Sequence, residues 1–199
     1  MTWYTIDFET SKRGTNAEPC EVALIEIGSD LTTLAATELL SVLSLSSYTE
    51  RFKPSHSIEP FVSAIHRIYD RDVRNCRPTS EFRLPADATG FIAHNASFDK
   101  AIAINHYKRI GEPMPPVKWL CTLQLARAIQ SYTGITFAAN NKLLTLFYHF
   151  YPHRLEEFKS KAHGAKADVE MCLLLLRALA PYAAPMTTVE ELVEFLDEL

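Results

Sequence analysis

Two acidic residues near the start of the chain are spaced so that their carboxylates could act together on one ligand. They are Asp7 and Glu9, within the strand-like stretch 4–10. Side chains of a strand alternate between its faces, so both acids should share one face, with Ile6 and Phe8 on the other. Burying unpaired carboxylates is unfavourable, so the pair favours a bound cation that prefers oxygen ligands, such as Mg²⁺ or Mn²⁺. An isolated Asp-x-Glu is more often a strand end at which both acids reach water.

Two later acids and a histidine could join this pair. Asp99 is expected in the first turn of a helix that follows the buried strand 90–93, and Asp168 within a helix whose apolar stripe continues through Leu175. His163 precedes Asp168 by five residues, which suits a loop position from which the ring leans over the acid. Taken singly, His163 would more often be a surface or core residue, and Asp168 an acid favoured by the helix dipole.

If these four carboxylates converge, each pair repels by about 4 kcal/mol at 4 Å for an effective dielectric near 20. Bound cations or protonation would make such a cluster tolerable. Two divalent ions roughly 3.5–4 Å apart are the arrangement that stabilises the attacking and leaving oxygens in phosphoryl displacement. A nearby neutral imidazole would supply a general base.

The elements that must position these residues alternate between strand and helix, as in α/β folds. Strands are expected at residues 4–10, 21–27, 48–53, 90–93 and 117–122, and helices at 58–68, 97–110, 123–130, 140–151, 165–179 and 187–199. The run 31–47 has mixed periodicity, and a strand is predicted at 37–45. Residues 70–87 are expected to form short helical turns and loop. We expect one domain over 1–199.

Side-chain caps are predicted for two of these helices. Asn95 or Ser97 should cap the helix at 97–110, and Thr187 with Glu190 should form a capping box for the acidic helix at 187–199.

Composition narrows the class of protein. The formal net charge of −4 disfavours a protein that coats nucleic acid by long-range attraction, although it permits one that grips a short end. The four cysteines are scattered, which predicts buried free thiols instead of a zinc site or disulfides. No stretch has the length of a membrane span and the N-terminus has no secretory pattern, so a cytoplasmic location is expected.

Three motifs together resemble the DEDDh family of 3′-to-5′ exonucleases, also called DnaQ-like or ribonuclease-H-like. They are Asp7-Phe8-Glu9-Thr10, His94-Asn95-Ala96-Ser97-Phe98-Asp99 and His163-Gly164-Ala165-Lys166-Ala167-Asp168. The chain is most similar to the exonuclease X branch, through Ala64-Ile65-His66-Arg67-Ile68 and the stretch 119–127. The resemblance is poor over about 29–47, which looks like an insertion, and between 134 and 161.

The resemblance implies a three-layer fold, with a five-stranded mixed sheet whose first three strands are antiparallel and which helices flank. It implies a metal site of two ions held by Asp7, Glu9, Asp99 and Asp168, with His163 as general base. The expected function is 3′-to-5′ hydrolysis of DNA to nucleoside 5′-monophosphates, alone or beside a repair or replication machine. An RNA-trimming exonuclease and a non-catalytic nucleic-acid-binding module are the alternatives.

Substrate contacts are also carried over from the family. The resemblance places Phe8, Thr10, Ile65 and His66 at the terminal nucleotide, although these four could equally be core. Asn95 and Lys166 are also expected to bind the substrate. Phosphate contacts are expected among Lys100, Lys142, Lys161 and Lys166, each of which would singly be a solvated lysine. The acidic C-terminal helix is a possible site for a protein partner.

Overall fold

A computed structural model describes residues 1–14, 16–37, 41, 45, 47–159 and 163–199 of the chain. Five strands form one mixed sheet in the order β3-β2-β1-β4-β5. Their bounds are β1 Thr2–Thr10, β2 Pro19–Gly28, β3 Ser47–Arg51, β4 Ala88–Ala93 and β5 Lys118–Cys121. β1 pairs antiparallel with β2 and parallel with β4, and β3 is antiparallel to β2. The predicted fold class and the antiparallel order of the first three strands are therefore confirmed.

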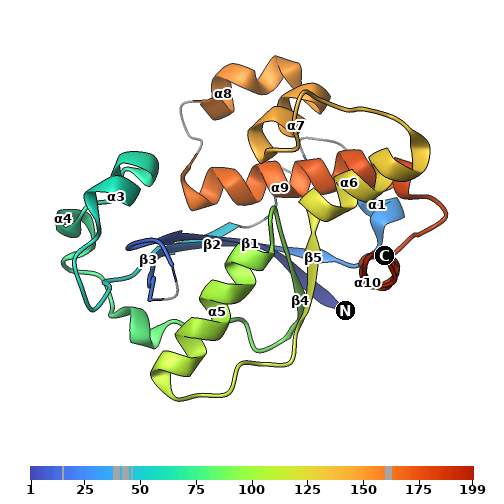
Figure 1. Cartoon of the computed structure of the whole chain (residues 1–199). Helices are drawn as coiled ribbons and strands as arrows, with labels where there is room; N and C mark the ends of the chain where they lie inside the picture. Colours follow the sequence, from blue (N-terminus) through green and yellow to red (C-terminus); the bar gives the residue numbers. More distant parts are fainter. Residues whose placement is uncertain (15, 38–40, 42–44, 46, 160–162) are drawn as a thin grey trace.

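Helices cover both faces of the sheet, which gives three layers (Figure 1). On one face α9 (Ala165–Leu179) packs against β1 and β2 and is joined by α6 (Thr122–Thr133) and α7 (Leu143–Phe150). On the other face lies α5 (Ser97–Ile110). The remaining elements are α1 Leu31–Ala36, α3 Pro60–His66, α4 Asp70–Val73, α8 Leu155–Lys159, α10 Val189–Asp197 and short 3₁₀ turns at Thr79–Glu81, Pro152–Arg154 and Ala180–Ala183.

The alternation of β1 divides the core between these two faces. Trp3 is fully buried on the α9 side, whereas Ile6 and Phe8 pack on the α5 side with Ile102 of α5. Gly90 of β4 lies opposite Trp3 in the parallel β1–β4 pair, and a Cβ added there would lie 2.4 Å from Trp3 Cζ3. Glycine at this position therefore leaves the space that the Trp3 ring occupies.

Several local predictions need correction. The capping box of α10 is formed by Thr188 and Glu191, one residue later than predicted. The residue that caps α5 is Ala96, with no side-chain cap, because Asn95 adopts a left-handed backbone (φ 66°) before the helix begins. Cys20, Cys121 and Cys172 are buried free thiols, as predicted, but Cys76 is only half-buried.

The other boundaries differ by a few residues. The helix predicted at 140–151 begins at Leu143, and the helix predicted at 58–68 spans Pro60–His66. The run before β3 contains α1, and most of the predicted strand 37–45 lies outside the described residues. Among the helices that the structure describes, none combines the length and the apolar character required to cross a membrane.

Candidate active site

Three of the predicted acids meet at one point of the sheet. Carboxylate oxygens of Asp7 and Glu9 on β1 and Asp168 on α9 all lie within 4.8 Å of one another. Asp7 and Glu9 are in reach of α9 because odd-numbered residues of β1 face it, as the strand pattern predicted. Asp168 lies in the first turn of α9, where its carboxylate also meets the positive end of the helix dipole.

The fourth acid, Asp99, reaches the same region from the opposite helix layer. It is buried in the first turn of α5, and its Oδ1 accepts a hydrogen bond of 3.2 Å from the backbone N–H of Phe8. This bond ties the start of α5 to the strand residue between Asp7 and Glu9. The structure thus brings all four predicted carboxylates together, from β1, α5 and α9.

Burial raises the pKa of every acid in this cluster, and repulsion by neighbouring carboxylates raises it further for Asp7, Glu9 and Asp99. Burial, then the charges of Asp168 and Glu21, raises the pKa of Glu9 to about 9. Burial raises the pKa of Asp99 to about 8, although the Phe8 hydrogen bond opposes it. The pKa of Asp7 is raised well above its ordinary value by burial and by Asp99 and Asp168. The cluster therefore holds protons near pH 7 unless a cation replaces them.

Asp168 is the acid whose pKa is least perturbed. Burial raises its pKa to about 6, while the nearby charge of His163 and a hydrogen bond from the His163 backbone lower it. An all-oxygen donor set whose members repel one another is the kind of site that hard divalent cations such as Mg²⁺ occupy. The residues present therefore fit a divalent-metal centre.

His163 stands two residues before α9, next to the capping residue Gly164, in a left-handed backbone conformation (φ 63°). Glu21 on β2 helps to fix this junction, because its Oε2 accepts a hydrogen bond of 3.2 Å from the Ala165 N–H and its Oε1 accepts one of 2.8 Å from Arg51 Nε. Glu21 lies opposite Glu9 in the β1–β2 register. The residue that orients the helix start is thus itself next to the acid cluster.

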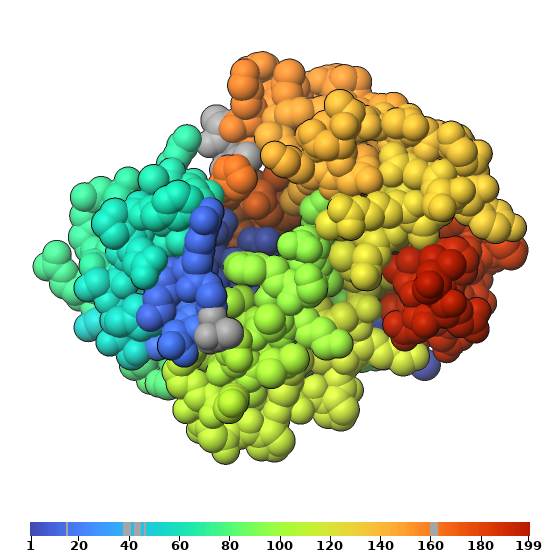
Figure 2. All heavy atoms as spheres, viewed as in Figure 1, coloured from blue at the N-terminus to red at the C-terminus, as the bar shows by residue number. Residues whose placement is uncertain are grey.

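A cleft of about 410 Å³ opens over the acids. Figure 2 shows it as the hollow among α3, the loop after β1, the start of α5 and the start of α9. Of the predicted site residues, those that line it are Asp7, Phe8, Glu9, Thr10, Ile65, His66, His163 and Asp168. Asp99 is buried beside Phe8, behind the cleft wall.

The predicted substrate residues are not equivalent in the structure. The Phe8 side chain is only 2% exposed and packs edge-on against Phe82, whereas Ile65 is 38% exposed. His66 uses both ring nitrogens, since Nδ1 accepts from the Ile68 N–H and Nε2 lies 3.1 Å from the Thr10 carbonyl oxygen. Phe8 and His66 therefore shape the wall mainly as packed residues, while Ile65 presents an open apolar surface.

Several of the predicted contacts lie outside the cleft lining. Asn95 is exposed but does not line the cleft, and its Oδ1 accepts from Ser97. Lys166 lines a separate hollow together with Glu21 and Arg154, on another side of the first turn of α9. Lys100 also lies outside the cleft lining, and Lys161 is outside the described residues.

Five cleft residues were not among the predicted site residues: Lys12, Arg13, Gly14, Val62 and Phe98. Lys12 and Arg13 bring positive charge to the rim, and the Arg13 guanidinium stacks 3.9 Å from the centroid of the exposed Phe61 ring. Lys12 and Arg13 could have been predicted from the sequence, because they closely follow the first motif, on the loop that leaves β1. Phe98, 43% exposed, stands inside the second motif beside Asp99.

His94 of the second motif has a structural position. Its Nδ1 lies 3.0 Å from Thr122 Oγ1 and its Nε2 lies 2.9 Å from the Asn141 carbonyl oxygen. Burial lowers its pKa to about 4, so the ring is neutral at ordinary pH. It connects the end of β4 to the start of α6 and to the segment before α7.

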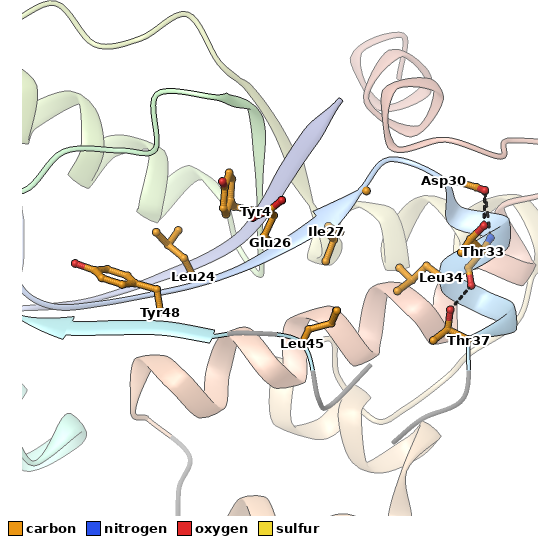
Figure 3. Close-up of a pocket in the computed structure, with 11 residues that line it drawn as sticks. Tyr4, Leu24, Glu26, Ile27, Asp30, Thr33, Leu34, Thr37, Leu45 and Tyr48 are labelled. Atoms are coloured by element: carbon orange, nitrogen blue, oxygen red, sulfur yellow. Dashed lines mark hydrogen bonds between the residues drawn. The ribbon is translucent and has the colours of Figure 1, made fainter. Parts of the chain in front are cut away.

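A larger hollow of about 580 Å³ lies beside β2 and α1 (Figure 3). The Asp30 carboxylate in its lining caps α1, where it accepts hydrogen bonds from the backbone N–H groups of Thr32 and Thr33. None of the four clustered carboxylates lines it. The chemistry predicted from the sequence therefore belongs to the smaller cleft.

Parts of this chain are similar in sequence to known proteins. It is 28% identical over 107 residues to exodeoxyribonuclease 10 of Escherichia coli strain K12, which covers 53% of this chain and 43% of that protein. It is 29% identical over 108 residues to the PolC-type DNA polymerase III of Lactococcus lactis subsp. lactis, covering 52% of this chain and 7% of that protein. The matched segments thus span less than half of either relative.

The fold has counterparts among solved structures. The structure of exonuclease X in complex with 5′-overhanging duplex DNA superposes with a TM-score of 0.62 at 22% identity, covering 98% of this chain and 99% of that one. The family model described as exonuclease (RNase T) matches residues 5–176. This match takes in all three motifs and most of the chain, which therefore belongs to this exonuclease family.

Proposed function

We propose that the chain is a divalent-metal-dependent 3′-to-5′ exonuclease that removes nucleoside 5′-monophosphates from DNA. The observation that carries this proposal is the convergence of Asp7, Glu9 and Asp168 within 4.8 Å at the floor of an open cleft, with His163 at its edge. Family membership supports the reaction class, and the names of the relatives support DNA as the substrate.

Asp7, Glu9 and Asp168 would hold one ion, with Asp7 helping to hold a second and Asp99 contributing directly or through water. Mg²⁺ or Mn²⁺ bound there would supply Lewis-acid stabilisation of the charge that develops on the phosphate oxygens. Since the acids carry raised pKa values, they would lose protons as they take up cations, and loading would strengthen as the pH rises.

His163 would accept the proton of the attacking water. Its position suits this role because it lines the cleft beside Asp168, and the contact between Glu21 and Ala165 fixes the backbone that follows it. Removal of this proton makes the water a better nucleophile toward the last phosphodiester. The bond to the neighbouring 3′ oxygen would then break, which leaves a new 3′ hydroxyl on the shortened strand.

The cleft walls would select the end of a strand. A volume of about 410 Å³ suits a single terminal nucleotide, and the lining combines apolar surface at Ile65 and Phe98 with charge at Lys12 and Arg13. Exposed aromatic and apolar side chains can stack on any base, whereas the two cations can contact neighbouring phosphates. This combination fits recognition of a chain end without sequence preference.

The experiment uses end-labelled single-stranded DNA, duplex DNA and RNA with the purified chain, in Mg²⁺ or in chelator. Stepwise loss from the 3′ end in Mg²⁺ alone is expected, and it should disappear in Asp7→Ala. Asp197→Ala is the matched control, since it removes an exposed acid from α10 outside the cleft. Near wild-type cleavage by Asp7→Ala would refute the site, and cleavage of RNA alone would replace DNA as the substrate.

A further inference from the structure

A second groove lies between α6 and α10, at an edge of the molecule away from the cleft. It has a volume of about 410 Å³ and is bounded by the last turn of α6, the segment 182–186 and one side of α10. In Figure 2 the surface of α10 is at the right, apart from the central hollow. The apolar members of its lining include Ile129, Tyr132, Tyr182, Met186 and Phe195.

Two tyrosines that line this groove have side chains exposed to solvent. Tyr132 is 89% exposed and Tyr182 is 43% exposed. The Tyr182 ring is held in place by Phe137, with ring centroids 5.1 Å apart, whereas no ring contact to Tyr132 is found among the described residues. Exposed aromatic side chains beside a flexible methionine are typical of surfaces that bind another protein.

The charge of the groove is strongly negative. Glu191, Glu194 and Glu198 line it, and so do Tyr132 and Thr133 of the last turn of α6, which is the negative end of that helix's dipole. Glu191 is engaged in the capping box and Glu194 lies 3.9 Å from Lys118 Nζ. Glu198 has no ion pair with any residue in the part of the chain that the structure describes.

This concentration of charge distinguishes α10 from the rest of the protein. Residues 187–199 contain five acidic residues and no Lys or Arg. The rest of the chain holds all 20 basic residues and 19 of the 24 acidic ones, so its formal charge is +1 although the whole chain has −4. The negative charge of the protein is thus carried by one terminal segment.

The groove is also distant from the acid cluster. Trp3 Nε1 donates a hydrogen bond of 2.7 Å to Glu190 Oε1, which fixes α10 at the beginning of β1. Glu9 lies six residues further along this strand, about 20 Å away at 3.3 Å per residue. A molecule in the groove would therefore leave the cleft open.

We propose that this groove is a docking site for a basic segment of a partner protein, which inserts an apolar side chain between Tyr132 and Phe195 and places Lys or Arg beside Glu194 and Glu198. The apolar floor provides the anchor pocket and the acidic rim provides the complementary charge. Nucleic acid is a poor occupant, because its phosphates would meet carboxylates and a negative helix end. The proposal does not depend on the chemistry in the cleft.

The test uses the whole chain and a short fluorescein-labelled peptide in which Leu and Phe alternate with Lys. Saturable binding is expected by fluorescence anisotropy, weakening as salt rises, and amide shifts in NMR spectra should cluster on α6 and α10. A peptide with Glu in place of Lys should not bind. Failure of the Lys peptide to bind at any concentration, or equal binding of the Glu peptide, would overturn the proposal.

Two variants locate the site. Glu198→Lys should weaken binding about tenfold or more, and Tyr132→Ala about fivefold or more. A lysine at the end of α10 is favourable for the helix dipole, so loss of binding would not reflect unfolding. Asp197→Lys is the matched control, since it makes the same charge change on the same helix outside the groove lining.

Other results identify other occupants and would also overturn the proposal. Equal weakening by Glu198→Lys and Asp197→Lys would indicate non-specific attraction to the whole helix. A concentration-dependent dimer that Tyr132→Ala converts to monomer would show that a second copy of the chain fills the groove. Competition of the peptide with single-stranded DNA would place the peptide in the cleft.

Discussion

Replacing Asp168 by asparagine removes one charge from the acid cluster while nearly preserving the shape of the side chain. Burial raises the pKa of this carboxyl from 3.8 to about 6 in the folded protein. The folded state therefore binds this proton more tightly than the unfolded state does. The stabilisation due to this group is complete below pH 3.8 and is lost as the pH rises through 6.

The expected size follows from these two pKa values. Their difference corresponds to about 3 kcal/mol at pH 8, at 1.36 kcal/mol for each tenfold change in proton affinity. The asparagine N–H₂ group lacks a matched acceptor in the cluster, which offsets part of this gain. Without metal at pH 8, Asp168→Asn should thus be more stable than wild type by about 1–3 kcal/mol, which raises the melting temperature by roughly 2–12 °C.

Thermal unfolding followed by circular dichroism measures this difference, in chelator and in excess Mg²⁺, near pH 4, 6 and 8. The advantage of the variant should shrink toward pH 4, where the wild-type carboxyl is neutral as well. In Mg²⁺ the wild type gains stability from ion binding that the variant has weakened, so the difference should narrow or reverse. Asp197→Asn, at an exposed acid of α10, should show none of these effects.

Two results would refute the reasoning. One is a metal-free variant that is less stable than wild type at pH 8, since this would mean that the Asp168 charge stabilises the fold. The other is a difference that stays constant from pH 4 to pH 8, since it could not arise from titration of this carboxyl.

Four further predictions address the base, the scaffold and the grip on substrate. His163→Ala should lower kcat about 10²–10⁴-fold while DNA binding by anisotropy is kept; unchanged turnover would contradict its role as base. Glu21→Ala should lower the free energy of unfolding in urea by about 1–3 kcal/mol, because Arg51 Nε and the Ala165 N–H lose their acceptor. Glu21→Gln should lower it less. Gly90→Ala should cost about 1–3 kcal/mol through the clash with Trp3, whereas Gly28→Ala, with nothing within 4 Å of the added Cβ, serves as its control. Trimming should be distributive with a shallow salt dependence, so excess unlabelled DNA added after the first cuts should stop shortening.

The sheet and the order of the acids could be predicted because they depend on local patterns. Alternation along β1 places Asp7 and Glu9 on one face whatever the rest of the chain does, and the apolar run of β4 predicts a buried strand. Motif order then predicts that Asp99 and Asp168 follow in separate helices. Their convergence is confirmed by the structure, whereas their catalytic roles stay predictions.

The capping box of α10 was predicted one residue too early, because local sequence alone does not determine its position. The sequence Thr187-Thr188-Val189-Glu190-Glu191 offers two boxes that differ by one residue. The fold selects the second, because Trp3 Nε1 binds the Glu190 carboxylate from the other end of the chain and leaves Glu191 for the cap. A contact between residues 187 positions apart cannot be inferred from the pattern of either segment.

Loop geometry limited the predictions about substrate contacts for the same reason. Asn95 and Lys166 stand within the motifs, yet the left-handed turn at Asn95 and the helical position of Lys166 direct both side chains away from the cleft. Lys12 and Arg13 reach the cleft because their loop closes on itself, with the Ser11 N–H donating to the Glu18 carbonyl oxygen at 2.8 Å. A residue's place within a motif therefore did not show whether its side chain lines the cleft.

The acid cluster is held together by packing at a distance from it, since its members repel one another. β1 is paired on both sides, and α9 buries Leu173, Leu174, Leu175 and Leu176 well beyond Asp168. Each buried leucine contributes about 1.5–3 kcal/mol, and without metal the protons held by Glu9 and Asp99, whose pKa values are raised to about 9 and about 8, reduce the repulsion among the acids. The scaffold can therefore keep the site assembled before any cation binds. Removing metal should consequently stop the reaction while the fold remains, because the repulsion is confined to the end of β1 and the first turns of α5 and α9.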